Sequence, residues 1–340
     1  MKLPVGAKLL GVGAAIPPTV VTNSDLEKLV DTSDDWITSR TGIKQRRIVT
    51  DETASGLAIE AARDAIAFAG IDAHIIDLII VATSTPDFLY PSTACLVQAD
   101  IGASNAVAFD LEAACTGIIY ALAVAQQFIG TGTFKTALVV GVDIHSRFLN
   151  WKDRNTCILF GDGAGAFILQ ATEPANNEIL GMYLRSDGTG AHLLQIPNIG
   201  TNYPHEGKDL PKSEAGVVHM NGRPIYEFAV KAVPEAVITT ADRAGIAVED
   251  IDYLIPHQAN SRIINAAADR LGMDHKKIIT NVDEMGNTSA ASIPLALWQA
   301  LKHKEMKLPA ICALVGFGAG LTWGAAIVRW TATDKRLQPV

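Results

Sequence analysis

The segment AGIDAHIIDLII at residues 69–80 recurs, with changes, as AGIAVEDIDYLI at residues 244–255. Its AGI and ID elements are both offset by 175 residues. A second pair follows in the same order, FGDGAGAFIL at 160–169 and GFGAGLTWGAAIV at 316–328, with an offset near 155. Two similar pairs in one order predict two related halves. Such halves favour a site between them, where equivalent strand ends meet.

The pattern around these segments is that of an α/β protein. Short β-branched runs predict strands, and alanine-rich stretches predict helices. Strands are expected over 76–84, 136–143, 164–171, 251–257, 310–317 and 324–330, after a first strand near 9–16. Helices are expected over 54–70, 115–130, 224–245, 260–272 and 289–302. The alternation indicates layered halves over residues 1–175 and 176–340, with about 20 surplus residues near 143–156.

The composition excludes several classes of protein. The 340 residues are 49% hydrophobic and 19% charged, which excludes disorder, and the net charge of −8 argues against nucleic-acid binding. The four cysteines are widely spaced and form no metal-ligand motif, so we expect no metal, no disulfide framework and a cytoplasmic location. No apolar run approaches the ~18 residues of a membrane span, so no membrane association is expected.

Three residues at the ends of expected elements could carry chemistry. Cys115, in FDLEAACTGII, stands at about the start of a helix, whose free N–H groups would lower a thiol pKa. His257, in LIPHQAN, ends an expected strand, where ligands bind in α/β folds. Asn287, in GNTSAAS, lies in a polar turn beside the counterpart of Cys115. Two alternative roles remain: Cys115 could be a buried structural cysteine, and Asn287 could simply cap a helix.

Together, AACTG, PHQAN and GNTSAAS resemble the thiolase superfamily, and most closely the β-ketoacyl-[acyl carrier protein] synthase III family. The resemblance runs almost from end to end and includes TSDDWITSRTGIKQRR (32–47), TPDFLYPSTAC (85–95) and WKDRNTCILFGDGAGA (151–166). It implies a thiolase-like α/β fold, with duplicated βαβαβαββ halves layered α-β-α-β-α. It also implies a homodimer.

The resemblance implies a decarboxylative condensation that starts type II fatty acid synthesis. Cys115 would take a short acyl group, such as acetyl, from acyl-CoA and form a thioester. Malonyl-[acyl carrier protein] would then lose CO2, and His257 and Asn287 would stabilise the resulting enolate oxygen. The backbone N–H groups of Cys115 and Ala319 would form a second oxyanion hole. No cofactor is implied, because acyl-CoA is a substrate.

The resemblance also implies binding residues. Those expected to bind coenzyme A are Trp36, Arg40, Arg154, Gly222 and Asn260. The alternative for Arg40 is that it belongs to a solvated basic face with no ligand. Those expected to line the acyl pocket are Tyr90, Phe317, Leu159 and His145, with Tyr90 contributed by the partner subunit. Those expected to dock the acidic carrier protein are Arg262 and Arg270.

Three positions depart from the family pattern. Glu227 and Asp269 stand where lysine is frequent, so Lys231 or Arg223 could serve the docking surface instead. His145 stands where an aliphatic residue is common, which leaves the primer open.

Other functions compete with this interpretation. A degradative thiolase needs a second cysteine in the C-terminal glycine turn, whereas Cys312 lies four residues too early, inside an expected strand. A related condensing enzyme, or a polyketide starter synthase with another primer or acceptor, would share the catalytic residues. A non-catalytic scaffold protein would have no need to retain Cys115, His257 and Asn287 together.

Overall fold

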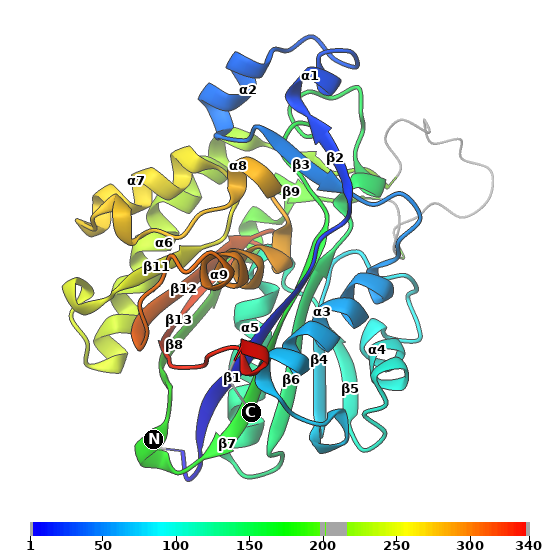
Figure 1. The fold of residues 1–340 in the computed structure, drawn as a ribbon. Coiled ribbons are helices and arrows are strands. Elements are labelled where there is room, and N and C mark those ends of the chain that lie inside the picture. Colours follow the sequence, from blue (N-terminus) through cyan, green and yellow to red (C-terminus); the bar gives the residue numbers. More distant parts are fainter. Residues whose placement is uncertain (1–2, 198–200, 202–215, 338–340) are drawn as a thin grey trace.

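Two β-sheets, one from each half of the chain, organise the fold (Figure 1). The computed structural model describes residues 3–197, 201 and 216–337. The first sheet has the order β1 (Gly6–Ala15), β7 (Gly163–Thr172), β6 (Thr136–Asp143), β4 (Leu78–Ala82) and β5 (Val107–Leu111). The second has the order β11 (Tyr253–Pro256), β12 (Ala310–Gly318), β13 (Thr322–Trp330) and β8 (Ile179–Ser186).

The two sheets repeat one pairing pattern. In the first, β4 runs parallel to β6, while β6, β7 and β1 are successively antiparallel. In the second, β11 runs parallel to β12, while β12, β13 and β8 are successively antiparallel. The first sheet adds β5, parallel to β4, at its edge. The arrangement is that of the duplicated thiolase-like α/β fold, which confirms the expected fold class.

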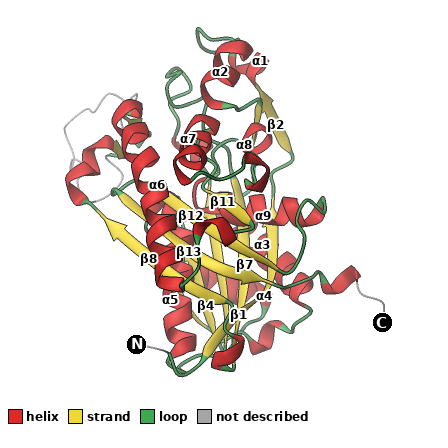
Figure 2. Ribbon diagram, turned by 90° about the vertical axis from the view of Figure 1, so that its left-hand side faces the viewer, coloured by secondary structure: helices red, strands yellow, loops and turns green. Residues whose placement is uncertain are grey.

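Helices form three layers around the sheets, giving the order α-β-α-β-α (Figure 2). The outer face of the first sheet is covered by α3 (Ala54–Ala69) and α4 (Thr93–Ile101). Between the sheets lie α5 (Gly117–Gly130) and α9 (Ser292–Lys302). The outer face of the second sheet is covered by α6 (Gly222–Ala244) and α7 (Ser261–Leu271).

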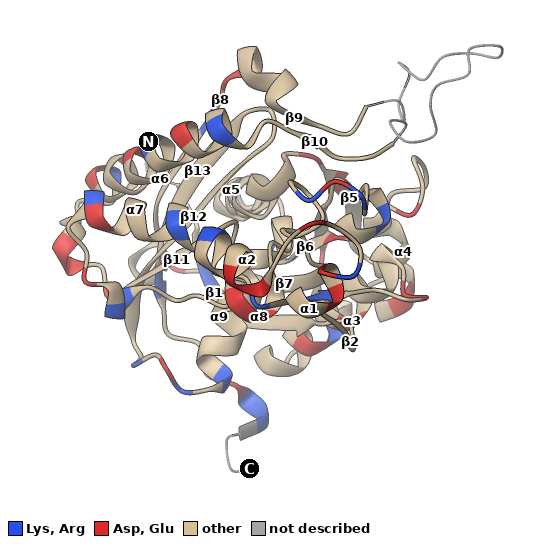
Figure 3. Ribbon diagram, turned by 90° about the horizontal axis from the view of Figure 1, so that it is seen from above, with Lys and Arg blue, Asp and Glu red and all other residues tan. Residues whose placement is uncertain are grey.

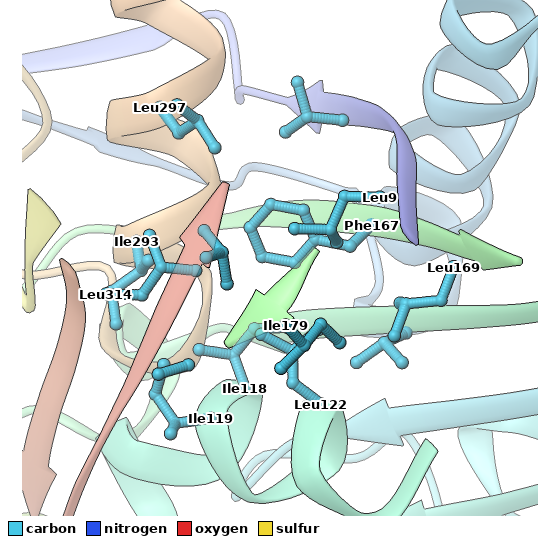
Figure 4. Packing of buried hydrophobic residues seen from close by; sticks show 14 of the residues in the cluster. Leu9, Ile118, Ile119, Leu122, Phe167, Leu169, Ile179, Ile293, Leu297 and Leu314 are labelled. Atoms are coloured by element: carbon cyan, nitrogen blue, oxygen red, sulfur yellow. The ribbon is translucent and has the colours of Figure 1, made fainter. Parts of the chain in front are cut away.

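The central layer holds the largest apolar core (Figure 4). Phe167 and Leu169 of β7 face this layer, whereas Ala166 and Ile168 of the same strand face α3. Both faces of the strand are therefore buried, and such strands are expected to read as continuous apolar runs. On the α3 side, a Cβ on Gly13 would lie 2.2 Å from the backbone nitrogen of Ala65, so alanine and glycine are needed for this close packing.

Several smaller elements lie near the ends of the strands that lead to the candidate site. They comprise β2 (Thr19–Thr22), α1 (Asn23–Leu26), α2 (Asp34–Thr41), β3 (Gln45–Ile48), β9 (Leu194–Gln195), β10 (His219–Met220) and α8 (Val282–Met285). Two short 3-10 segments, η2 (Ala114–Thr116) and η8 (Ser289–Ala291), precede α5 and α9. Arg46 of β3 is fully buried, and its guanidinium donates to Asn23 Oδ1 and to the carbonyl of Ile158. It thereby ties these elements to the chain that leads into β7.

All of the expected strands and helices are present, and the differences are additional elements. In the main layers the unexpected elements are β5, β8 and α4, which are only partly buried or short. The smaller elements β2, β3, β9, β10, α1, α2 and α8 were not expected either. The expected surplus lies between β6 and β7, in residues 144–162, whereas residues 319–321 alone join β12 to β13. The boundary at residue 175 lies between β7 and β8 and stays a prediction. Within the described ranges, no helix is long and apolar enough to cross a membrane.

Candidate active site

Cys115, His257 and Asn287 line one cavity of about 130 Å³, which we name cavity B. Cys115 lies in η2, directly before α5. His257 follows the last residue of β11, and Asn287 lies between α8 and η8. Three segments far apart in the sequence therefore meet where strands end, as the repeat predicts.

The chain turns sharply at Cys115. Ala114 has a φ of 47°, a left-handed conformation that costs free energy for a residue with a Cβ. A Cβ on Gly318 would lie 2.8 Å from the backbone nitrogen of Cys115, so a side chain there would collide with this turn. Glycine at 318 therefore brings the turn after β12 close to Cys115, where Ala319 lines a neighbouring cavity.

The predicted fall in the thiol pKa of Cys115 is wrong for this structure. Burial raises the pKa of Cys115 to about 12, and the charges of Asp143 and Glu112 add to the rise. The Ser289 hydroxyl, which donates to Cys115 Sγ over 3.2 Å, offsets part of it. Cys115 is only 6% exposed, so the effect of burial on its pKa exceeds the opposing effect of the helix start. The resting group is therefore a thiol.

His257 is a neutral, buried imidazole. Burial is the main reason that its pKa falls to about 3, with a smaller contribution from His145. Nδ1 lies 2.7 Å from Ser292 Oγ, and the ring packs edge-on against Phe317 at a centroid distance of 5.2 Å. The backbone N–H of His257 donates to the carbonyl of Val315 on β12. The ring is therefore held on several sides and stays uncharged at neutral pH.

The amide of Asn287 has a defined orientation. Its Oδ1 accepts a hydrogen bond from the backbone N–H of Ser289 over 2.9 Å, so Nδ2 is left to donate. The backbone is fixed as well, because the Asn287 N–H donates to Leu159 and its carbonyl accepts from Gly161. Asn287 is thus a preorganised N–H donor in the wall of cavity B.

A second cavity of about 250 Å³, cavity A, shares Cys115, Phe160 and Leu194 with cavity B. His145 lines it and stacks on Phe160 at a centroid distance of 4.8 Å. Of the residues predicted for an acyl pocket, His145 alone lines cavity A. Leu159 and Phe317 line cavity B instead, because the Phe317 ring is packed against His257.

Tyr90 lines neither cavity in the single chain and is 87% exposed. Its neighbours Phe88 and Leu89 are also exposed. These three apolar side chains lie between β4 and α4, at the side of the first sheet where β5 is the edge strand.

Two of the five residues predicted to bind coenzyme A lie in the wall of cavity B. Gly222 and Asn260 line it. Asn260 donates from Nδ2 to the carbonyl of Arg40, which joins α7 to α2. The Arg154 guanidinium lies 5.1 Å from the centre of the Trp36 ring and donates to the carbonyl of Asp31. Arg40 is therefore bonded to a residue of the cavity wall, whereas Trp36 and Arg154 contact each other and line neither cavity.

The surface of α6 and α7 carries interspersed acidic and basic residues (Figure 3). Arg262 is exposed, with its guanidinium 5.6 Å from the centre of the Tyr226 ring. Arg270 donates to the carbonyl of Val230 on α6, so its side chain is partly engaged within the fold. Glu227 pairs with Arg223 at 2.9 Å, which reduces the effect of an acidic residue here.

Sequence reasoning missed three buried polar residues that support the site. Ser289 donates to Cys115, Ser292 contacts His257, and the Asp143 carboxylate accepts from the backbone N–H of Ala290. The two serines stand inside GNTSAAS, so their spacing from Asn287 was a usable signal. Asp143 had none, because its role depends on the packing of β6 against η8.

Among the described residues, neither a metal-ligand cluster nor a second cysteine lines the cavities. No cluster of potential metal ligands occurs within the described ranges. Cys115 is the one described cysteine in the wall of either cavity. Cys312 is buried in β12, which separates it from the glycine turn that a degradative thiolase would use.

Comparisons with known proteins agree with the geometry. Residues 109–188 match the family described as 3-oxoacyl-[acyl-carrier-protein (ACP)] synthase III, and residues 241–330 match its C-terminal family. The chain is 52% identical over 328 residues to β-ketoacyl-[acyl-carrier-protein] synthase III of Thermosynechococcus vestitus, covering 96% of this chain and 98% of that protein.

Solved structures are similar over nearly the whole chain. The 3-oxoacyl-[acyl-carrier-protein] synthase III of Aquifex aeolicus VF5 is 42% identical, with a TM-score of 0.88, covering 96% of this chain and all of that one. The priming β-ketosynthase of the R1128 polyketide pathway is 32% identical, with a TM-score of 0.91 and 98% of each chain covered. The chain therefore belongs to the β-ketoacyl-[acyl-carrier-protein] synthase III family of condensing acyltransferases.

Proposed function

We propose that the chain condenses a short acyl group from acyl-CoA with malonyl-[acyl carrier protein], yielding 3-oxoacyl-[acyl carrier protein], CO2 and CoA. The observation that carries this proposal is the meeting of Cys115, His257 and Asn287 in cavity B. One thiol and two neutral N–H donors suit acyl storage followed by enolate formation. The test measures acyl-enzyme mass and CO2 release as separate half-reactions.

In the first half-reaction, Cys115 Sγ attacks the acyl-CoA carbonyl and a new C–S bond replaces the bond to coenzyme A. The proton of the Cys115 thiol leaves with the CoA thiol, so no external base is consumed. The backbone N–H groups of Cys115 and Ala319 are positioned on the η2 turn and on the turn after β12. We assign them to the oxyanion of the tetrahedral intermediate.

In the second half-reaction, malonyl-carrier loses CO2 and the electron pair forms an enolate. His257 and Asn287 donate to the enolate oxygen, whose charge is larger than that of the ground-state carbonyl. A neutral imidazole at this position stays a donor without an extra buried charge. The enolate carbon then attacks the acyl group on Cys115. A C–C bond forms, the C–S bond breaks, and the released thiolate takes a proton from solvent.

Coenzyme A is assigned to the rim of cavity B, at Trp36, Arg40, Arg154, Gly222 and Asn260. An arginine beside an indole ring is suited to phosphates and an adenine, because it offers both charge and a stacking surface. The acyl group would enter cavity A, whose volume of about 250 Å³ suits a short primer. His145 lines this cavity, and Phe317 and Leu159, which line cavity B, would contact the thioester portion.

The active assembly is proposed to be a homodimer. Leu89 and Tyr90 are 85% and 87% exposed, and such neighbouring apolar side chains favour burial against another subunit. The edge strand β5 carries a half-exposed Val107, which is also suited to a partner surface. We expect a dimer in sedimentation at micromolar concentration. A stable monomer there would contradict both the assembly and the placement of Tyr90 at a partner's acyl pocket.

The carrier protein is proposed to dock at Arg262 and Arg270 on α7, supplemented by Lys231 or Arg223. Arg262→Glu should raise KM for malonyl-carrier and leave acylation by acyl-CoA within about twofold of wild type. A charge at the rim acts mainly on association, so the effect should shrink at high salt. Lys135→Glu is the control, because it also replaces an exposed positive charge with a negative one, at a position just before β6. Equal losses in both half-reactions would show that Arg262 has a structural role.

No cofactor is proposed, since each bond change uses substrate thioesters and side chains. A cytoplasmic location, without a membrane or nucleic-acid partner, is proposed from the composition. The higher identity to the Thermosynechococcus synthase than to the polyketide priming synthase favours fatty acid initiation over secondary metabolism.

A further inference from the structure

We propose that Ser292 is a positioning residue that holds His257 in the Nε2-protonated tautomer and thereby makes it a donor for decarboxylation. This inference rests on the proposed function. It depends on one contact, the 2.7 Å separation of Ser292 Oγ from His257 Nδ1.

The contact lies in a part of the fold that excludes water. Ser292 is 0% exposed and His257 is 2% exposed. Ser292 is the first residue of α9, and η8 fixes it directly after Ala291. The other side of the imidazole is packed against Phe317, and its backbone is bonded to Val315. Neither side chain can therefore rotate easily to find another partner.

Counting donors and acceptors selects one tautomer. A serine hydroxyl carries one proton to donate, and a neutral imidazole has one N–H and one bare nitrogen. In the described part of the chain, Nδ1 of His257 is the one hydrogen-bond partner of Ser292 Oγ. If the hydroxyl donates to a bare Nδ1, both groups are satisfied. If Nδ1 carried the proton, the buried hydroxyl would have no acceptor, which is costly.

The selected tautomer has a chemical consequence. With Nδ1 bare, the proton is on Nε2, the ring nitrogen not engaged by Ser292. Together with Nδ2 of Asn287, it supplies the second N–H donor in the wall of cavity B. The opposite tautomer would present a lone pair to the enolate oxygen and repel it. Ser292 thus acts on the second half-reaction through His257, without contacting the substrate itself.

The chain provides a matched comparison within one motif. Ser289 and Ser292 are both buried serines of GNTSAAS, but Ser289 contacts Cys115 Sγ. Ser292→Ala should lower CO2 release about tenfold and change acylation less than twofold, because one buried hydrogen bond is lost. Ser289→Ala should show the reverse, since its hydroxyl helps to lower the thiol pKa. Ser292→Thr keeps a hydroxyl and should recover CO2 release in part.

The decisive readout is the tautomer itself, observed by ¹⁵N NMR of labelled histidine with long-range ¹H–¹⁵N correlations. The wild-type protein should show His257 protonated at Nε2, and Ser292→Ala should show a mixture. This readout needs no substrate, so it decides the inference even if the wild-type protein releases no CO2, which would refute the proposed function alone. A wild-type His257 protonated at Nδ1 would overturn the inference.

A purely structural role gives a different result. Thr240→Val removes another buried hydroxyl, one that donates to Ala236 within α6, far from the cavities. It reports the effect of losing any buried hydroxyl on thermal unfolding and on both half-reactions. If Ser292→Ala lowered both half-reactions equally, as a general loss of fold would, or left the tautomer unchanged, Ser292 would not position His257.

Discussion

Cys115→Ala should accept no acyl group from acyl-CoA, yet should still release CO2 from malonyl-carrier. The substitution removes the sulfur atom that we propose forms the thioester, so no mass increase is expected after incubation with acetyl-CoA. His257 and Asn287 stay in place, because the alanine leaves the η2 turn and its neighbours unchanged. Intact-protein mass spectrometry and release of labelled CO2 measure the two results.

Cys95→Ala is the control for acylation, because Cys95 is exposed on α4 and lines neither cavity. It should acquire the acyl group as the wild-type protein does. An acylated Cys115→Ala protein would place the nucleophile elsewhere. If Cys115→Ala lost both acylation and CO2 release, Cys115 would be needed for enolate formation. That result would contradict the proposed division of roles.

Asn287→Ala should give the opposite pattern. Cys115 should still become acylated, while CO2 release and condensation should fall about 10²–10³-fold, equivalent to about 2.7–4 kcal/mol of transition-state stabilisation for one lost oxyanion donor. Asn287→Asp sharpens the test, since Oδ1 can still accept from Ser289 while the Nδ2 donor is replaced by an acceptor. Its CO2 release should fall at least as far.

Asn281→Ala is the matched control, because Asn281 is also a buried asparagine, bonded to Gln299 and absent from both cavity walls. It should keep the wild-type ratio of CO2 release to acylation even if the protein is less stable. Should Asn287→Ala lose acylation and keep decarboxylation, the roles of the two half-reactions would have to be reversed.

The fold was predictable where the sequence is periodic and buried. The runs at 136–143 and 310–317 became central strands, because both of their faces are covered by helices. β5 and β8 were not recognised, since their partial exposure gives weaker apolar patterns. The repeat indicated that Cys115 and the turn at Asn287 would meet, but side-chain orientation depended on packing between residues remote in sequence.

The electrostatics of the site illustrate this limit. A helix start near Cys115 was visible in the sequence, and it suggested a lowered thiol pKa. Burial reverses the direction of the pKa shift, and the residues that pack against Cys115, such as Gly318, are distant in the chain. The contact of Ser292 with His257 joins the start of α9 to the end of β11, so no local pattern could show it.

The connection between β6 and β7 is much longer than the equivalent connection between β12 and β13. This difference affects how the range of primers accepted by such enzymes can change. Residues 144–162 leave and re-enter the first sheet at the paired positions Asp143 and Gly163. The segment supplies His145 and Phe160 to the cavity walls, whereas the three-residue counterpart at 319–321 supplies Ala319 alone. Because both ends are anchored on neighbouring strands, insertions at exposed positions of the segment, such as Lys152 and Asn155, should cost less stability than changes at its buried residues. Laboratory evolution toward longer or branched primers should therefore accumulate its successful changes in this segment and leave the oxyanion donors of the other half untouched.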